Sequence, residues 1–468
     1  MMMLGLNNIG CNKKKLRLSR SLLTVDRLLS EHPVDEVSVD SFCLIQRSDQ
    51  DSVCSAFTDY VHRNTIKSIS LETSVPTNDE SEVSESCWCL VEAMADLEQG
   101  CLSNLQHLTL KLRHCDPGVA PLIPWDRGVI GSVRASQGLR ELVLNVPFVS
   151  TSQMEDLARL LTSDAAPNLT ELSLSNMNMT DETLKIFAKH VCHTANQHNS
   201  LAQRLEVLSF WRNELAGQSL RHLKRIVTDM RNLSRLDICG NGGLFLDDYR
   251  AKDVGRFFDA IAGHDRLDTL LLRACSMSDQ DASQLFQALI HNRSIKHLDM
   301  DYNHIGVLGL SSLVRSLPRL STLRVLEMDD LRLESLARQY EESPPTSRRR
   351  LTWSNFRQSR QFFGWGESQH EALLQAIDAN LSLTHLRLDN RILSVDIQSK
   401  RKIEQVGQTN LRLHQLVEAH GMSHVSWQAA LERTSALWNT RQRQGSALYL
   451  LLLRGIETNS LSPFCKGS

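Results

Sequence analysis

The chain has 468 residues, of which 41% are hydrophobic and 23% charged, and its formal net charge is −2. This balance is ordinary for a soluble globular chain, and it excludes the strong overall positive charge that draws a protein to nucleic acid. A single compact core rarely extends over such a length, whereas a stack of repeats can.

Residues 1–33 are predicted to form a basic N-terminal segment or cap. The stretch KKKLRLSR, from Lys13 to Arg20, follows a short apolar stretch, which is the reverse of the order in a secretory signal. We therefore expect no secretion. A disordered basic tail or a first capping helix is the favoured interpretation of this stretch, and a nuclear-import or anionic-lipid segment is the alternative.

From Val34 onward, one apolar pattern, LxxLxL, returns along the chain. In SIKHLDMDYNHI, residues 294–305, the pattern begins at Ile295, and in RLDTLLLRACSM it begins at Leu267, 28 residues earlier. The other copies begin at Val34, Ile66, Leu105, Leu139, Leu169, Leu205, Leu233, Leu323 and Leu383. A recurrence of this kind is typical of stacked supersecondary units.

Each copy is predicted to be a strand followed by a helix. The fourth and sixth residues of a copy lie on one face of an extended segment, so these apolar residues point inward. Segments between copies, such as 279–293 and 308–317, carry apolar residues at helical spacing. A repeated strand and helix requires parallel strands with crossover connections. Because a helix is wider than a strand, the stack should curve with the strands inside.

Two stretches are predicted to be loops inserted into the array. Residues 74–86 are polar and acidic, and residues 334–350 contain Pro344 and Pro345. A spacer is the favoured interpretation of both loops, and a binding or modification site is the alternative.

The interval from Leu323 to Leu383 is 60 residues, which is two repeats wide. The stretch RRRLTW, with Leu351 and Trp353, is predicted to be a degenerate repeat inside this interval.

Residues 396–468 are predicted to form a helical C-terminal cap and a short tail. The last repeat of a solenoid needs cover for its apolar edge. Apolar residues such as Ile403, Val406 and Leu416 follow helical spacing, and the stretches VSWQAALERTSALW and SALYLLLLRG are further helical candidates. The last of these is too short to cross a bilayer, which takes about 20 residues.

Eleven cysteines are scattered at irregular spacing. This usage indicates reduced thiols and predicts a cytoplasmic location, with the nucleus as the alternative. Cys87, Cys89, Cys101 and Cys115 match no common zinc spacing, so they are interpreted as buried or incidental thiols.

The strand residues at repeat positions three, five, seven and eight should line the concave surface. The copies that begin at Ile295 and Leu323 place five carboxylates and no Lys or Arg there: Asp299, Asp301, Glu327, Asp329 and Asp330. Adjacent strands lie about 4.8 Å apart, which sets Asp299 beside Glu327 and Asp301 beside Asp329. These acids are predicted to form a negative patch that a basic segment of another protein contacts.

Neighbouring copies contribute Trp211, Arg212 and Arg273 to the same surface, and Tyr302 follows the acids of its own strand. Trp, Tyr and Arg are the residue types that most often anchor protein interfaces. Trp211 and Tyr302 are therefore predicted to be apolar anchors for the partner. The alternative is an ordinary solvated face.

The pattern LxxLxLxxNxL is intact at residues 295–305, with Asn303, and at 205–215, with Asn213. With these copies, residues 34–395 resemble the leucine-rich repeats of the ribonuclease-inhibitor type. The resemblance implies an α/β horseshoe solenoid with parallel strands on the concave face, helices outside and a helical C-terminal cap. It also implies that the Asn side chain binds backbone groups in the turn after each strand; Asn241 and Cys275 stand at that position in other copies.

No phosphate loop, nucleophile elbow, zinc-protease motif or dinucleotide fingerprint occurs in the sequence. Strand histidines such as His107, His297 and His385 alternate with inward leucines and are predicted to be surface residues. We therefore predict a non-enzymatic protein-interaction scaffold without a cofactor, a membrane span or a nucleic-acid partner. The alternative is a regulator of a small GTPase, because activators of Ran-type GTPases share this repeat type; such proteins typically carry an acidic C-terminal tail, and this sequence ends in SLSPFCKGS.

Overall fold

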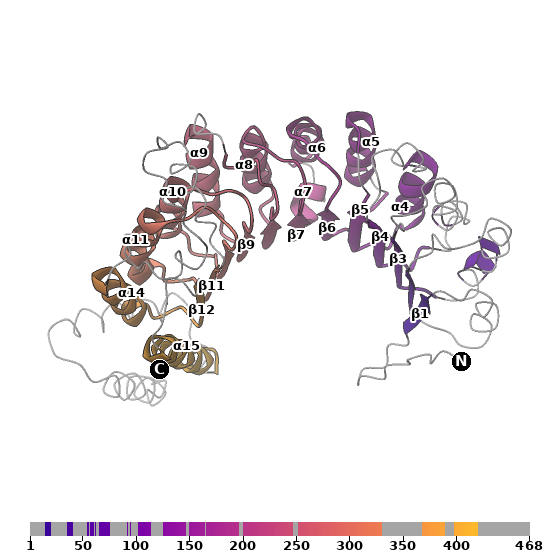
Figure 1. The fold of residues 1–468 in the computed structure, drawn as a ribbon. Coiled ribbons are helices and arrows are strands. Elements are labelled where there is room, and N and C mark those ends of the chain that lie inside the picture. The colour runs from indigo at the N-terminus through magenta and orange to yellow at the C-terminus, as the bar shows by residue number, and fades with distance from the viewer. Residues whose placement is uncertain are drawn as a thin grey trace, which may run out of the picture.

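A computed structural model describes residues 15–19, 35–40, 54–55, 57–59, 61, 65–74, 91, 94, 102–113, 125–146, 149–163, 165–195, 200–246, 251–329, 367–388 and 397–419. Its strands form a 12-stranded sheet in which spatial order equals chain order. The strands lie along the inner side of an arc and the helices along its outer side (Figure 1). The predicted horseshoe, with parallel strands inside and helices outside, is confirmed.

The strands of this sheet are β1 (Lys15–Ser19), β2 (Glu36–Asp40), β3 (Ser68–Ser74), β4 (His107–Arg113), β5 (Glu141–Asn145), β6 (Glu171–Leu174), β7 (Val207–Ser209), β8 (Arg235–Asp237), β9 (Thr269–Leu271), β10 (His297–Asp299), β11 (Val325–Met328) and β12 (His385–Leu388). The helical segments are η6 (Trp125–Ile130), α4 (Gly131–Ala135), α5 (Thr151–Thr162), α6 (Asp181–His193), α7 (Leu201–Arg204), α8 (Ser219–Asp229), α9 (Ala251–Ala262), α10 (Asp279–Leu289), α11 (Val307–Ser316), η8 (Leu317–Arg319), α14 (Glu367–Ala379) and α15 (Ile397–Ala419).

The strand register places the inward leucines of successive repeats side by side. Leu270, Leu298 and Leu326 are direct partners across β9, β10 and β11, and all three are fully buried. One continuous apolar core extends from Val37 in β2 to Ile403 in α15. The inward orientation predicted for the fourth repeat position is therefore confirmed.

Polar side chains also join successive helices. Ser278 and Asp281 form a capping box at the start of α10. The neighbouring Asp279 carboxylate accepts hydrogen bonds from the backbone N–H groups of Gly306, at 2.6 Å, and Gly309, at 2.8 Å, at the start of α11. A Cβ atom at Gly309 would lie 2.7 Å from that carboxylate, so the close approach of the two helices requires glycine.

The interpretation of the N-terminal basic stretch as a disordered tail or a capping helix is wrong for residues 15–19. This segment is neither a disordered tail nor a helix, because it forms the strand β1, which pairs in parallel with β2 from Lys15–Glu36 to Ser19–Asp40. The alternation in KLRLS is a period-two pattern that favours a strand. The other residues of the segment 1–33 lie outside the described residues.

The degenerate repeat predicted at Leu351 and Trp353 does not add a strand between its neighbours. Strand β11 pairs directly with β12, with Val325 opposite His385 and Glu327 opposite Arg387. The helical layer agrees, because α14 contacts α11 and η8. The 60-residue interval therefore adds one strand, β12, to the described sheet rather than two. Residues 334–350 and the stretch RRRLTW lie outside the described residues, as do residues 75–86 of the other predicted loop.

Helix α15 covers the last described strand, as expected of a C-terminal cap. The Asn410 side chain donates hydrogen bonds to the backbone carbonyls of Asn380, at 3.1 Å, and Leu383, at 2.7 Å. A Cβ atom at Gly407 would lie 2.5 Å from the carbonyl oxygen of Thr384, so the helix can approach this closely only with glycine there. The further helices predicted between 420 and 468 lie outside the described residues. Within the described part of the chain, no helix combines the length and apolar character needed to span a membrane.

Candidate functional site

The turns that leave the five strands β6 to β10 share an unusual backbone conformation at repeat position eight. Residues at this position in five repeats have positive φ: Asn176, Arg212, Gly240, Ala274 and Tyr302. The left-handed conformation is strained for most residue types, so neighbouring groups must hold it. At Gly240 a Cβ atom would also lie 2.9 Å from Cγ of Arg212, and this glycine therefore leaves room for the arginine.

Buried asparagines hold these turns. Asn303 donates from its side-chain amide to the carbonyls of Leu272 and Met300, each at 2.9 Å. Its side-chain oxygen accepts from the backbone N–H groups of Cys275 and Met277, each at 3.0 Å. The side chain thus bonds backbone groups in the turn after the strand, as the resemblance implied, and in addition it bonds groups of the preceding repeat. Asn213 makes the corresponding bonds in its own repeat.

Cys275 replaces asparagine in the intervening repeat. Its thiol donates to the carbonyl of Ile238 at 3.2 Å, the acceptor that corresponds to the one Asn303 uses on Leu272. Cys275 is fully buried, and burial raises the pKa of its thiol to about 12. The thiol is therefore a weak structural donor rather than a nucleophile.

The turn after β10 carries the most heavily bonded acid of the concave face. Asp301 is 1% exposed. One of its carboxylate oxygens pairs with the terminal amino groups of both Arg273 and Arg387. The other oxygen accepts a hydrogen bond from the backbone N–H of Asp329 at 2.6 Å. Asp301 is thus enclosed by groups from three repeats, and it is not a solvated acid.

The neighbouring acids share the same two arginines. Asp299 is 8% exposed, and its carboxylate lies 3.4 Å from Nε of Arg273. Glu327 lies 3.5 Å and Asp329 3.9 Å from the guanidinium of Arg387. Burial is the main cause that raises the pKa of Asp299, and the charges of Asp301 and Glu327 add to it. With every group ionised, these four acids and two arginines keep a net charge of −2.

The acids alone have the spacing of a metal site. Oxygen atoms of Asp299, Asp301 and Glu327 lie within 4.8 Å of one another. However, the Arg387 amino group that pairs with Asp301 also lies 3.5 Å from Glu327. A cation from the protein itself, the Arg387 guanidinium, therefore already pairs with two of these three acids.

Two aromatic side chains at the strand ends are stacked with arginines. The Arg212 guanidinium lies 4.6 Å from the ring centre of Trp211, and that of Arg273 lies 5.3 Å from the ring centre of Tyr302. Such stacking restricts both partners and presents a flat, amphipathic surface. Tyr302 is 37% exposed, while Trp211 is partly buried.

The predicted site residues divide by their surroundings. Three acids pair with Arg387, and Asp299 and Asp301 pair with Arg273, so these side chains form one cluster, and Tyr302 joins it through Arg273. Trp211 and Arg212 form a separate pair three strands away, at about 14 Å for a strand spacing of about 4.8 Å. Asp330 lies outside the described residues.

Arg387 is the member of the cluster that sequence reasoning missed. The 60-residue interval suggested an intervening strand, which would have separated Arg387 from the acids. Its position as the fifth residue of the last copy of LxxLxL was the available signal.

Among the strand histidines, His107 lies 2.9 Å from Glu141, and His385 is exposed, as predicted for surface residues. Cys87, Cys89, Cys101 and Cys115 lie outside the described residues.

Comparison with known proteins agrees with this architecture. No protein-family model matches the sequence. Mouse ribonuclease inhibitor is 28% identical over 253 residues, which cover 53% of this chain and 51% of that protein. Human "NACHT, LRR and PYD domains-containing protein 13" is 27% identical over 180 residues, which cover 38% of this chain and 16% of that protein.

The chain is a leucine-rich-repeat solenoid that is similar to the ribonuclease inhibitors. The leucine-rich-repeat chain spans about half or less of the length of the curated relatives it matches. Among solved structures, leiomodin-1 actin-binding site 2 is 15% identical and aligns with a TM-score of 0.30, over 43% of this chain and 92% of that one. A similarity this low does not extend to function.

Proposed function

We propose that this chain is a non-enzymatic protein-interaction scaffold that binds a partner protein on its concave strand face. The curved sheet displays one row of side chains per repeat, and solenoids commonly use such extended concave surfaces for binding. The ribonuclease inhibitors carry a name that describes action on another protein, which supports the same type of activity here.

The proposed contact surface, called the concave edge below, consists of Trp211, Arg212, Arg273, Tyr302, Glu327 and Asp329, together with Asp330. The single observation that carries the proposal is that two aromatic side chains at the strand ends stack on arginines, Tyr302 within a cluster that retains negative charge and Trp211 three strands away. Desolvated aromatic and arginine side chains are the usual anchors of protein interfaces.

We further propose that the partner presents a basic segment to this edge. The cluster keeps a net charge of −2 despite its two arginines, so a Lys or Arg of the partner gains from approaching it. Glu327 and Asp329 have side chains that are 21% and 37% exposed, and they would make the direct contacts. Asp299 and Asp301 would not contact the partner directly; they contribute negative charge to the cluster and hold its arginines in place.

The experiment is a comparative affinity purification from native lysate. The test variants are Trp211→Ala and the double variant Glu327→Gln/Asp329→Asn, which removes charge but leaves Asp301 and its arginines in place. The matched control is Glu155→Gln/Glu182→Gln on the helices, where the two side chains are 40% and 63% exposed. Proteins bound by the wild type should be lost or reduced in both test variants and retained in the control. Full retention of every bound protein in the test variants would refute the proposal.

Regulation of a small GTPase stays the alternative prediction. A hydrolysis assay with Ran-type GTPases decides it, because acceleration of GTP hydrolysis by the chain would replace the scaffold proposal.

We also propose that the protein acts in a reducing compartment, the cytoplasm or the nucleus. Cys192, Cys239 and Cys275 are buried as free thiols, which supports this location.

A further inference from the structure

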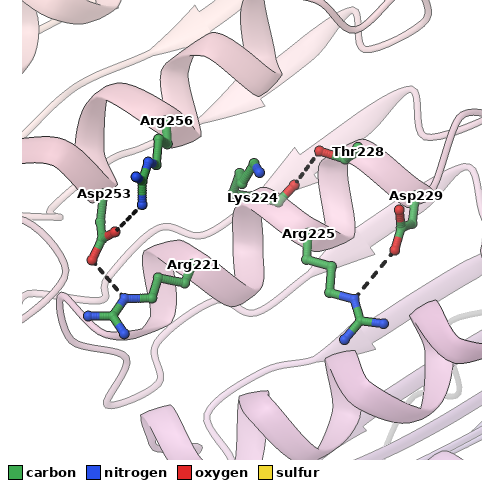
Figure 2. A pocket seen from close by; sticks show the side chains of 7 residues that line it. All are labelled: Arg221, Lys224, Arg225, Thr228, Asp229, Asp253 and Arg256. Atoms are coloured by element: carbon green, nitrogen blue, oxygen red, sulfur yellow. Dashed lines mark hydrogen bonds and ion pairs between the residues drawn. The ribbon is translucent and has the colours of Figure 1, made fainter.

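A hollow lies in the helical layer, on the side of the molecule away from the strands. Its volume is about 460 Å³, and residues of α8 and α9 line it: Arg221, Lys224, Arg225, Thr228, Asp229, Asp253 and Arg256 (Figure 2). Arg221, Lys224, Arg225 and Thr228 follow one another at intervals of three, one and three residues, so they lie on one face of α8. Four lining side chains are basic and two are acidic, so the pocket has a net charge of +2.

The arginines are held in a way that leaves their terminal amino groups available. Nε of Arg221 lies 2.8 Å from the Asp253 carboxylate, and Nε of Arg225 lies 3.5 Å from that of Asp229. Figure 2 shows the terminal nitrogens of both guanidinium groups directed away from these carboxylates. An arginine fixed through Nε can still donate two parallel hydrogen bonds to an oxyanion.

The acids act as fixed supports for the pocket. Asp253 is largely buried, and a second arginine, Arg256, approaches its other oxygen at 3.8 Å. Lys224 lies on the α8 face between Arg221 and Arg225, and it forms no ion pair with any described residue. Its ammonium group is thus the least compensated charge of the pocket.

We propose that this pocket binds a small anion with two phosphate groups. Arg221 and Arg256 stand at one end and Arg225 at the other, with Lys224 between them, which suits two linked anionic groups better than one (Figure 2). Guanidinium groups match phosphate oxygens in bidentate geometry, and an ammonium group adds a point charge. The site is independent of the concave edge, because no residue belongs to both.

The test is isothermal titration of the full chain with pyrophosphate, inorganic phosphate and a nucleoside diphosphate, at ionic strength balanced with chloride. The test variant is Lys224→Gln, which breaks no ion pair among the described residues. The matched control is Lys252→Gln, because Lys252 is an exposed lysine of α9 that does not line the pocket. Thermal unfolding without ligand checks that both variants fold like the wild type.

The expected result is saturable binding of pyrophosphate, tighter than that of phosphate, weakened about tenfold by Lys224→Gln and unchanged by Lys252→Gln, as for a charge-assisted hydrogen bond. Binding of pyrophosphate alone would assign the free anion as the ligand, whereas binding of the nucleoside diphosphate as well would extend the site to diphosphate esters. Three results would overturn the proposal: no saturable binding, equal loss in both lysine variants, or equal affinity for phosphate and pyrophosphate.

Discussion

Asp301 combines nearly complete burial with two arginine partners and a backbone donor. A buried charge of this kind adds little net stability as a pair, but removing one member leaves the others desolvated and uncompensated. Its role is therefore to define the geometry of the concave face rather than to contact a partner directly.

Replacing Asp301 by Ala should lower the free energy of unfolding by about 3 kcal/mol, because Arg273 and Arg387 would lose their shared buried acceptor. The control Asp329→Ala removes a more exposed carboxylate and should cost less than about 1 kcal/mol. Urea denaturation of both variants measures the difference. Equal losses in the two variants would contradict the structural role of Asp301.

Asp299 provides a prediction about pH. Burial raises its pKa in the folded protein above the ordinary value of 3.8, so the folded state binds this proton more tightly than the unfolded state does. Ionisation of Asp299 therefore lowers stability as the pH rises from about that value through the raised pKa. Asp299→Asn keeps an oxygen for the backbone N–H of Asp301, at 3.0 Å in the wild type, and removes the titration.

The stability of this variant relative to the wild type should increase with pH across that window and then level off. Denaturation curves at a series of pH values measure this difference directly. A difference that falls with increasing pH would show that the carboxylate, rather than its protonated form, is favoured by folding.

At the scale of the repeat element, asparagine and glycine residues largely determine the conformation of the turns and the close contacts between elements. Asn303 satisfies backbone groups in two turns. The resemblance to leucine-rich repeats implied such bonds in the turn after the strand, but not the bonds to the preceding repeat. The sequence pattern did not reveal that position five is partly covered by neighbouring strands, because exposure on a curved sheet depends on the side chains of the next repeats. Asp299 was consequently expected to be more solvated than it is.

Asn303→Ala should lower the free energy of unfolding by about 3 kcal/mol, since several buried backbone groups would lose their partner. The control Asn168→Ala removes an exposed side chain whose bond to the Gln137 carbonyl is 3.4 Å long, and it should cost less than about 0.5 kcal/mol. Thermal or urea unfolding of both variants checks this. A cost at Asn303 no larger than at Asn168 would refute the role of the asparagine in the turns.

Gly407 in the cap helix α15 and Gly255 in α9 form a matched pair of helical glycines. Gly407→Ala would place a Cβ atom 2.5 Å from the Thr384 carbonyl and should destabilise the packing of α15 on β12, even though alanine is the better helix former. Gly255→Ala on α9 meets only Gln284, at 3.6 Å, and should stabilise the protein by about 0.5–1 kcal/mol. Amide hydrogen exchange in α15 separates the two effects. Unchanged protection of α15 in Gly407→Ala would contradict the close approach.

At the scale of the whole molecule, the period of the leucines was enough to predict a single curved sheet. It was not enough to predict which segments become neighbours where the period breaks. The interval before Leu383 has room for two repeats, and an apolar pair at Leu351 and Trp353 fits the pattern, so spacing alone favoured an extra strand. Likewise, the pocket between α8 and α9 depends on how two helices pack, which no periodicity of the sequence records.

The direct pairing of β11 with β12 determines the composition of the concave face, because it brings Arg387 to Asp301 across 86 residues of chain. A double-mutant cycle with Asp301→Asn and Arg387→Gln measures this proximity as a coupling free energy. The structure predicts a coupling of at least about 1 kcal/mol between the two substitutions. Costs that add within about 0.3–0.5 kcal/mol would show that the two side chains do not interact, and would contradict both the strand order and the cluster built on it.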